Sequence, residues 1–101
     1  MKRYSDRYLR ALRNDIPIDD VIRALELPAK EVEGYFRFLC PVCRDQHTAT
    51  NPRTNLARCF RCQVNYNPID LVMKVRACGF LEAVRYLQRR FLSTTKEPDE
   101  Q

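Results

Sequence analysis

The chain has 101 residues with a formal net charge of +5, and only two residues are glycine. This length and composition indicate one small domain and exclude a collagen-like or low-complexity chain. The hydrophobic core of so small a domain benefits from additional stabilisation, for example by a bound metal. No apolar segment approaches the ~20 residues that cross a bilayer, and the N-terminus lacks the apolar stretch of a secretory signal. We therefore expect a cytoplasmic protein without a membrane segment, whose thiols stay reduced.

The positive charge is concentrated in the second half of the chain. Between residues 41 and 65, Arg44, Arg53, Arg58 and Arg61 stand against one carboxylate, that of Asp45. Further lysine and arginine side chains follow up to residue 92, again in excess of the acidic ones. Such clustering is typical of a polyanionic partner, most often nucleic acid, but a solvated basic surface explains the charge equally well.

The N-terminal half predicts two short helices and a strand. Ser5 is a typical N-cap for a first helix that carries apolar residues at helical spacing. A second helix begins after Pro17 and stops at Pro28. Its expected buried stripe is Val21, Ile22 and Leu25. The aromatic run over residues 35–40 predicts a strand that leads into the first cysteines.

The C-terminal half predicts a hairpin and two helices. The segments "HTAT" and "LARCF" read as strands joined by the turn "NPRTN". Asn67 is expected to cap a helix in which Asp70 reaches back to the cap, and Gly79 to mark the end of that helix. The last helix is expected to bury one face, formed by Phe80, Val84, Leu87 and Phe91.

Four cysteines form two Cys-x-x-Cys pairs, Cys40 with Cys43 and Cys59 with Cys62. The spacing is that of a tetrahedral zinc site, in which each pair (here called a knuckle) aims two thiolates at one point. Four protein ligands leave no position for water, so we predict one structural Zn²⁺ ion and no catalytic metal. The same four thiolates also suit iron, so iron remains an alternative to zinc. Disulfides would leave a fifth cysteine unpaired, and neither pair opens a helix as a redox motif does.

Two further residues have chemistry that the knuckles do not use. His47 lies four residues beyond Cys43 and could replace one cysteine as a ligand, but we expect it to be a polar residue at a strand edge. Cys78 is expected to be a free, partly buried thiol.

The order of these features resembles the zinc-binding domain of DnaG-type bacterial DNA primases. The resemblance spans Ile16 to Phe91 and rests on "IPIDDVIRALELP", "LCPVC", "RCFRC", "NPIDLVMK" and "GFLEAVRYL". It implies an α+β fold, a zinc ribbon with a small antiparallel β-sheet flanked by short helices. We expect residues 1–15 to form an N-terminal helical extension, residues 16–92 the primase-like zinc-binding domain, and residues 93–101 a polar, disordered tail.

The chain departs from the family pattern in two places. Cys43 stands where the family usually has His, which makes the metal site one unit more negative. The family favours glycines around its second knuckle, where this chain has Arg61, Gln63 and Asn65. The acidic cluster that would hold magnesium for nucleotidyl transfer is also missing, so we expect no catalysis by this chain unless a catalytic subunit acts in trans.

The resemblance implies binding of single-stranded template DNA, with a polymerase, a helicase or a primase catalytic subunit as further partners. Arginines beside the cysteines can neutralise phosphates, and exposed aromatic rings can stack on bases. Of the aromatic residues, we expect Phe36 and Phe60 in the core and Tyr66 at the surface. The predicted nucleic-acid contacts are Arg44, Arg53, Arg58, Arg61, Tyr66 and Lys74. The alternative is a protein-docking domain in which the zinc ribbon is a scaffold for a replication or regulatory partner.

Overall fold

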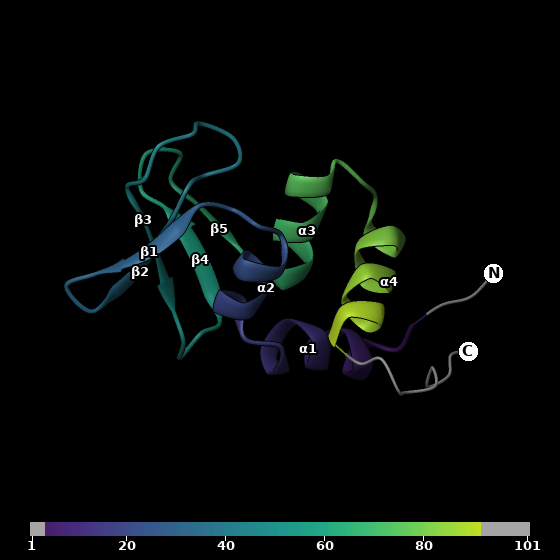
Figure 1. The fold of residues 1–101 in the computed structure, drawn as a ribbon. Helices are drawn as coiled ribbons and strands as arrows, with labels where there is room; N and C mark the ends of the chain where they lie inside the picture. Colours follow the sequence, from purple (N-terminus) through teal and green to yellow (C-terminus); the bar gives the residue numbers. More distant parts are fainter. Residues whose placement is uncertain (1–3, 92–101) are drawn as a thin grey trace.

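The computed structural model describes residues 4–91, with strands at one end and helices at the other (Figure 1). The tail predicted for residues 93–101 lies outside this range. In chain order the elements are α1 (Asp6–Asp15), α2 (Ile18–Ala24), β1 (Ala29–Val32), β2 (Tyr35–Phe38), β3 (Thr48–Asn51), β4 (Leu56–Cys59), β5 (Val64–Tyr66), α3 (Pro68–Arg76) and α4 (Phe80–Phe91). The predicted α+β fold is confirmed, and none of the described helices is both long and apolar enough to span a bilayer.

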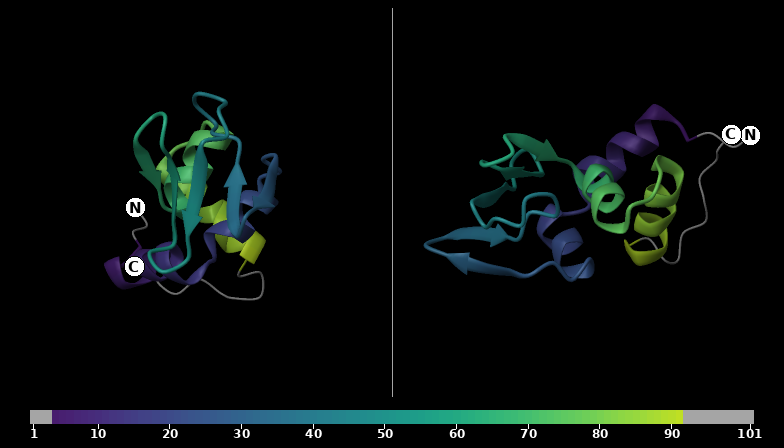
Figure 2. Two further views of the ribbon diagram at one scale, coloured as in Figure 1. Left: turned by 90° about the vertical axis from the view of Figure 1, so that its left-hand side faces the viewer. Right: turned by 90° about the horizontal axis from the view of Figure 1, so that it is seen from above.

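The strands form two small antiparallel sheets. β1 and β2 make a hairpin that projects from the body of the molecule (Figure 2), and β3, β4 and β5 make a second sheet with β4 in its centre. Thr48 joins the two sheets, because its hydroxyl donates to the carbonyl of Phe38 and accepts the Phe38 backbone N–H at 2.8 Å. β1 and β5 are short, and their sequences do not alternate in polarity clearly enough to predict them.

The register of the second sheet decides which of its side chains face the core. Ala57 of β4 lies opposite Tyr66 of β5, and both are buried against the helices. Arg58 follows Ala57 and lies opposite Asn65, which precedes Tyr66, so both of these side chains point to the other face. The outer face of this sheet is therefore polar at its centre.

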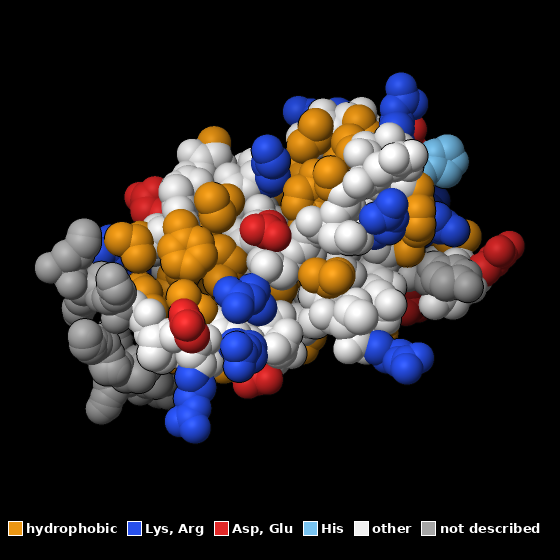
Figure 3. Space-filling model, turned by 180° about the vertical axis from the view of Figure 1, so that it is seen from behind, with side chains coloured by type: hydrophobic (Ala, Val, Ile, Leu, Met, Phe, Trp, Pro, Cys, Tyr) orange, Lys and Arg blue, Asp and Glu red, His pale blue; other side chains and the backbone are white. Residues whose placement is uncertain are grey.

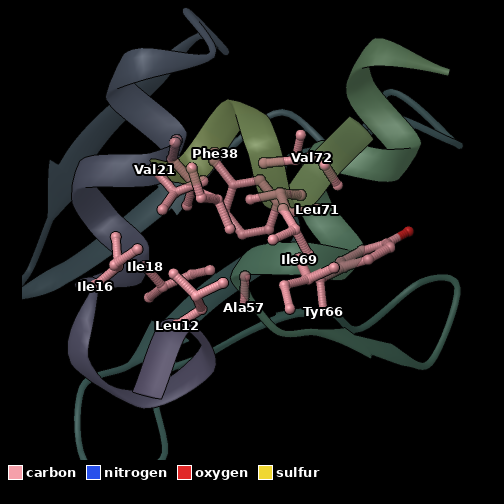
Figure 4. Close-up of a cluster of buried hydrophobic side chains, with 14 of the residues drawn as sticks. Leu12, Ile16, Ile18, Val21, Phe38, Ala57, Tyr66, Ile69, Leu71 and Val72 are labelled. Carbon is pink, nitrogen blue, oxygen red and sulfur yellow. The ribbon is translucent and has the colours of Figure 1, made fainter. Parts of the chain in front are cut away.

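One hydrophobic core connects the strands with the helices (Figure 4). Leu12 of α1 is 1% exposed and belongs to the same cluster as Phe38 of β2 and Leu71 of α3. The complete buried cluster is Leu12, Ile16, Ile18, Val21, Ile22, Phe36, Phe38, Ala57, Tyr66, Ile69, Leu71, Val72, Ala83, Val84 and Leu87. Because every helix contributes to it, the helices hold the sheet in a fixed orientation.

A buried amide ties the turn between β3 and β4 to the first two helices. The Asn55 side chain accepts the Ile18 N–H at 2.9 Å and donates to the carbonyls of Arg13 and Ile16, each at 2.7 Å. These bonds satisfy backbone groups at the end of α1 and the start of α2, which would otherwise lack partners in the protein. Asn55 is thus more than the turn residue that its position in "NPRTN" suggests.

The starts of α1, α2 and α3 confirm the expected signals, but α2 ends at Ala24, before Pro28. Asn67 and Asp70 form the predicted capping box, with the Asp70 N–H donating to the Asn67 side chain at 2.8 Å and the Asn67 N–H to the Asp70 carboxylate at 3.3 Å. The prediction that Gly79 ends this helix is wrong. Ala77 takes the left-handed conformation instead, with φ 51°, and its N–H donates to the Met73 carbonyl.

The buried face of α4 differs from the expected one at its first residue. Ala83, Val84 and Leu87 are fully buried, but Phe80 is 40% exposed. Side chains in a helix tilt toward its N-terminus, so the side chain of the first residue extends past the end of the helix and away from the core. The prediction that Phe80 packs in line with Val84 is therefore wrong.

Candidate metal centre and the surface around it

The two knuckles bring four sulfur atoms within 4.8 Å of one another. Cys40 Sγ lies 3.9 Å from Cys62 Sγ, and Cys43 Sγ lies 3.6 Å from Cys59 Sγ. A tetrahedron with Zn–S bonds of about 2.3 Å has S···S edges of about 3.8 Å. The four thiols therefore fit a single zinc ion, and each of these two close pairs joins one knuckle to the other.

Both knuckles are followed by the same backbone turn. Arg44 has φ 62° and donates its N–H to the Cys40 carbonyl at 3.0 Å. Gln63 has φ 58° and donates its N–H to the Cys59 carbonyl at 2.8 Å. These are left-handed positions where glycine is usual, so both knuckles keep this turn without one, at a cost in strain.

Two thiols of this cluster, those of Cys40 and Cys62, differ strongly in pKa. Burial raises the pKa of Cys40, but backbone N–H groups of Cys43 and Val42 stabilise its thiolate, and its pKa falls to about 7. Burial raises the pKa of Cys62 to about 12, with further contributions from the other three thiols and the charge on Cys40. Four neighbouring thiolates repel one another unless a cation offsets the charge. Binding of zinc by this cluster is therefore coupled to release of protons.

A charged network outside the cysteines links the two knuckles. One oxygen of Asp45 accepts the His47 backbone N–H at 2.8 Å and lies 2.9 Å from His47 Nδ1, and its other oxygen lies 3.4 Å from Nη1 of Arg61. The backbone N–H of His47 is the main cause that lowers the pKa of Asp45; burial opposes it, and the charges of His47 and Arg61 add to it. The His47 side chain is 77% exposed and is not in the group of possible metal ligands. His47 thus faces Asp45 next to β3.

Tyr66 does not lie where we expected it. Its side chain is 4% exposed, and its hydroxyl lies 4.0 Å from Cys40 Sγ. Burial raises the pKa of this hydroxyl, and the charge on Cys40 raises it further. The prediction that Tyr66 is a surface residue is wrong, because the register with β4 turns it toward the core and the metal site.

Phe60 takes the exposed position instead. We expected it in the core together with Phe36; Phe36 is 8% exposed, but Phe60 is 52% exposed, so the prediction for Phe60 is wrong. The Arg58 guanidinium lies 5.5 Å from the centre of the Phe60 ring. The sequence holds a signal for this placement. Cys59 must point to the metal, so its neighbours on both sides point the other way.

A hollow of about 770 Å³, which we call the sheet groove, lies between the outer face of the second sheet and residues of α2, β1 and β2. Arg53, Arg58, Phe60 and Asn65 line it, together with two carboxylates, those of Asp19 and Glu31. Arg58 Nη1 donates to the Asn65 side chain at 3.3 Å, so the guanidinium is held in place over the groove. Two of the predicted arginines therefore meet at one surface, next to an aromatic ring that sequence reasoning placed elsewhere.

The other predicted contacts lie outside this groove. Lys74 of α3 lines a separate hollow of about 760 Å³, here called the α3 groove, together with Val42 and Val64. Arg44 and Arg61 are exposed residues of the knuckles and line neither groove. The predicted set thus divides into a sheet surface, a knuckle surface and a helix surface.

Comparison with known proteins agrees with the metal site. The chain matches the family model of the CHC2 zinc finger over residues 4–101. It is 30% identical over 87 residues to a DNA primase of Streptomyces coelicolor. The matched region covers 84% of this chain and 14% of that protein. The chain therefore corresponds to a small part of the primase that it resembles.

Proposed function

Since this chain belongs to the CHC2 zinc-finger family, we propose that it is a non-catalytic, zinc-stabilised module that binds single-stranded DNA in a primase or replication context. The observation that carries the proposal is the sheet groove, where Arg53, Arg58 and Phe60 lie together. Arginine supplies contacts to phosphates, and an exposed aromatic ring supplies a stacking surface for a base. Neither contact depends on the base sequence of the DNA, and a module that binds a template strand needs contacts of this kind.

Arg58 is the best-positioned of these contacts. Its hydrogen bond to Asn65 and its position over Phe60 restrict the side chain before DNA arrives. A restricted side chain loses less conformational entropy on binding than a free one. Phe60 leaves half of its surface in water, and a stacked base would cover it. We therefore assign phosphate binding to Arg53 and Arg58 and base stacking to Phe60.

The zinc ion has a structural role in this proposal. Four cysteines complete its coordination, and among residues 4–91 they are the one group of three or more side chains that fits a metal. We propose that nucleotide chemistry belongs to a catalytic part outside this chain, with a polymerase, a helicase or a primase catalytic subunit as partner and the cytoplasm as compartment. Arg44 and Arg61, at the knuckles, and Lys74, on α3, remain proposed contacts of the same DNA.

The test is binding of a fluorescent single-stranded oligonucleotide to the zinc-loaded protein across a salt series. We expect affinity to fall steeply with salt, and Arg58→Glu to weaken binding on the order of tenfold at low salt. Arg10→Glu is the matched control, because Arg10 is an exposed residue of α1, away from the sheet groove. A wild-type protein that binds no single strand at low salt would refute the proposal.

A second candidate function is protein docking, and one observation favours it. Phe80 and Leu81, in the first turn of α4, are 40% and 42% exposed. Exposed apolar side chains next to each other are typical of a contact with another protein. A partner complex that survives high salt and nuclease, and that Leu81→Ser disrupts, would support docking. Loss of the complex in high salt would instead favour contact through nucleic acid.

A further inference from the structure

We propose that the DNA strand continues beyond the sheet groove, along the α3 groove, to a cluster of three arginines between α3 and α4 that binds its backbone phosphates. This arginine cluster consists of Arg76, Arg85 and Arg89. The inference rests on the proposed binding of single-stranded DNA by the sheet groove. It adds a second contact region on the helical half of the molecule.

The arginine cluster surrounds a small hollow of about 190 Å³. Arg85 and Arg89 are one turn apart on α4, so their side chains lie on the same face of the helix. Arg76 is the last residue of α3, and its guanidinium lies 4.8 Å from the centre of the Tyr86 ring. The two helices thus bring three guanidinium groups to the rim of one hollow.

The charge of this hollow is unbalanced. Among residues 4–91, Glu82 is the one acidic side chain that lines it, against three arginines. The ion pairs recorded for residues 4–91 involve Arg23, His47 and Arg61, so no arginine of the cluster has a carboxylate within 4.0 Å in that range. Two like charges one turn apart on a helix repel each other, and a bound anion would relieve that repulsion.

The size of the hollow and the type of its side chains favour phosphate. Small-molecule pockets usually measure about 300–1,000 Å³, so a hollow of about 190 Å³ is too small for a nucleoside. A phosphate group is smaller, and guanidinium groups bind it through paired N–H donors. On a single strand bound by the sheet groove, the group that would enter this hollow is a backbone phosphodiester.

Shared lining residues connect this hollow with the sheet groove. Asn65 lines both the sheet groove and the α3 groove. Cys78 lines both the α3 groove and the hollow of the arginine cluster. The three hollows are therefore neighbours, in the order sheet groove, α3 groove, arginine cluster.

The α3 groove has the surface that such a path needs. Lys74 supplies a positive charge there and Asp70 a negative one, and Val42 and Val64 in the same groove expose 54% and 38% of their surface. Apolar side chains of this kind can contact sugars and bases, while the lysine contacts a phosphate. On the face seen in Figure 3, Lys and Arg side chains lie over both halves of the molecule, with exposed hydrophobic side chains between and beside them.

The experiment compares short and long oligothymidylates, of about 4 and about 16 nucleotides, which span the usual range of site sizes of small single-strand-binding domains. Wild-type protein is expected to bind the long strand more tightly and with a steeper dependence on salt. The double variant Arg85→Gln/Arg89→Gln is expected to reduce the salt slope for the long strand by about 1.4, which corresponds to two phosphate contacts. Its affinity for the short strand is expected to stay within about twofold of wild type, because the sheet groove is intact.

The matched control is Arg7→Gln/Arg10→Gln, which removes two exposed arginines of one helix that line none of the three hollows. It is expected to leave the salt slope for the long strand within about 0.3 of wild type. Equal losses in both double variants would mean that net charge alone matters, and would overturn the path. The path also fails if the arginine-cluster variant binds the long strand like wild type, or if polyglutamate displaces that strand as well as nucleic acid does. Wild-type protein that binds neither strand refutes the proposed function itself, and this inference with it.

Discussion

Replacement of Asn55 by alanine tests how the sheet is attached to the helices. The substitution removes one acceptor and two donors, whose bonds to Ile18, Arg13 and Ile16 measure 2.9, 2.7 and 2.7 Å. Each buried hydrogen bond contributes about 1 kcal/mol, and a backbone group left without a partner costs more. Asn55 also has φ 58°, which alanine tolerates less well than asparagine by roughly 0.5–1 kcal/mol. We expect Asn55→Ala to lower the free energy of unfolding by about 3–5 kcal/mol.

The assay is denaturant unfolding of the zinc-saturated protein, followed by circular dichroism. Asn55→Gly separates the two causes, because glycine accepts the positive φ and lacks the amide. If the hydrogen bonds dominate, Asn55→Gly is expected to lose at least about 2 kcal/mol as well. Asn51→Ala, in the same turn, removes one exposed acceptor of the Arg53 N–H and is expected to cost less than about 1 kcal/mol. A loss below about 1 kcal/mol in Asn55→Ala would refute the reasoning.

Three further predictions concern the metal site and the surface beside it. Zinc uptake at pH 7 is expected to release at least two protons, because the pKa values of Cys43 and Cys62 are raised, that of Cys62 to about 12, and Cys40, with a pKa of about 7, is partly protonated. Calorimetry in buffers of different ionisation enthalpy measures the number of protons released, and zinc affinity should fall as pH falls. Gln63→Gly is expected to stabilise the protein by about 0.5–1 kcal/mol, because glycine adopts the left-handed conformation of this residue without strain. Gln46→Gly, at a residue without positive φ, should not stabilise it. Equal effects of the two substitutions on the midpoint of thermal unfolding would contradict strain at Gln63 as the cause. Phe60, which is 52% exposed, is proposed to stack on a base, so Phe60→Ala is expected to weaken binding of single-stranded DNA on the order of tenfold without loss of zinc. Tyr66→Phe, at a buried residue, is expected to leave that binding unchanged. The reverse ranking in the oligonucleotide assay would count against base stacking by Phe60.

The metal site and several element ends could be predicted from the sequence. The four cysteines are spaced as two turns that each aim a pair of thiolates, and the structure brings their sulfur atoms within 4.8 Å. Ser5 and Asn67 cap α1 and α3 as expected. These features depend on residues three or four positions apart, so the chemistry that decides them lies within a short segment.

Other features of the candidate site could not be predicted in this way. β1 has mostly exposed residues and β5 has three residues, so neither carries a pattern strong enough to identify it. The end of α3 also escaped prediction, since Ala77 takes a conformation for which Gly79 was the better candidate. β1 and β5 are defined by their pairing with β2 and β4, which the residues of the two short segments do not show by themselves.

The sequence by itself determined the chemistry of the metal site, the four helices and three of the five strands, and the excess of basic residues beside the cysteines. The tertiary structure decided which of those residues share a surface. Tyr66 and Phe60 look alike as aromatic residues near the second knuckle, but the pairing of β4 with β5 buries Tyr66 at the zinc site and leaves Phe60 beside Arg58. Strand pairing sets the direction of every side chain in a sheet, and it depends on contacts between segments that no single stretch of sequence contains.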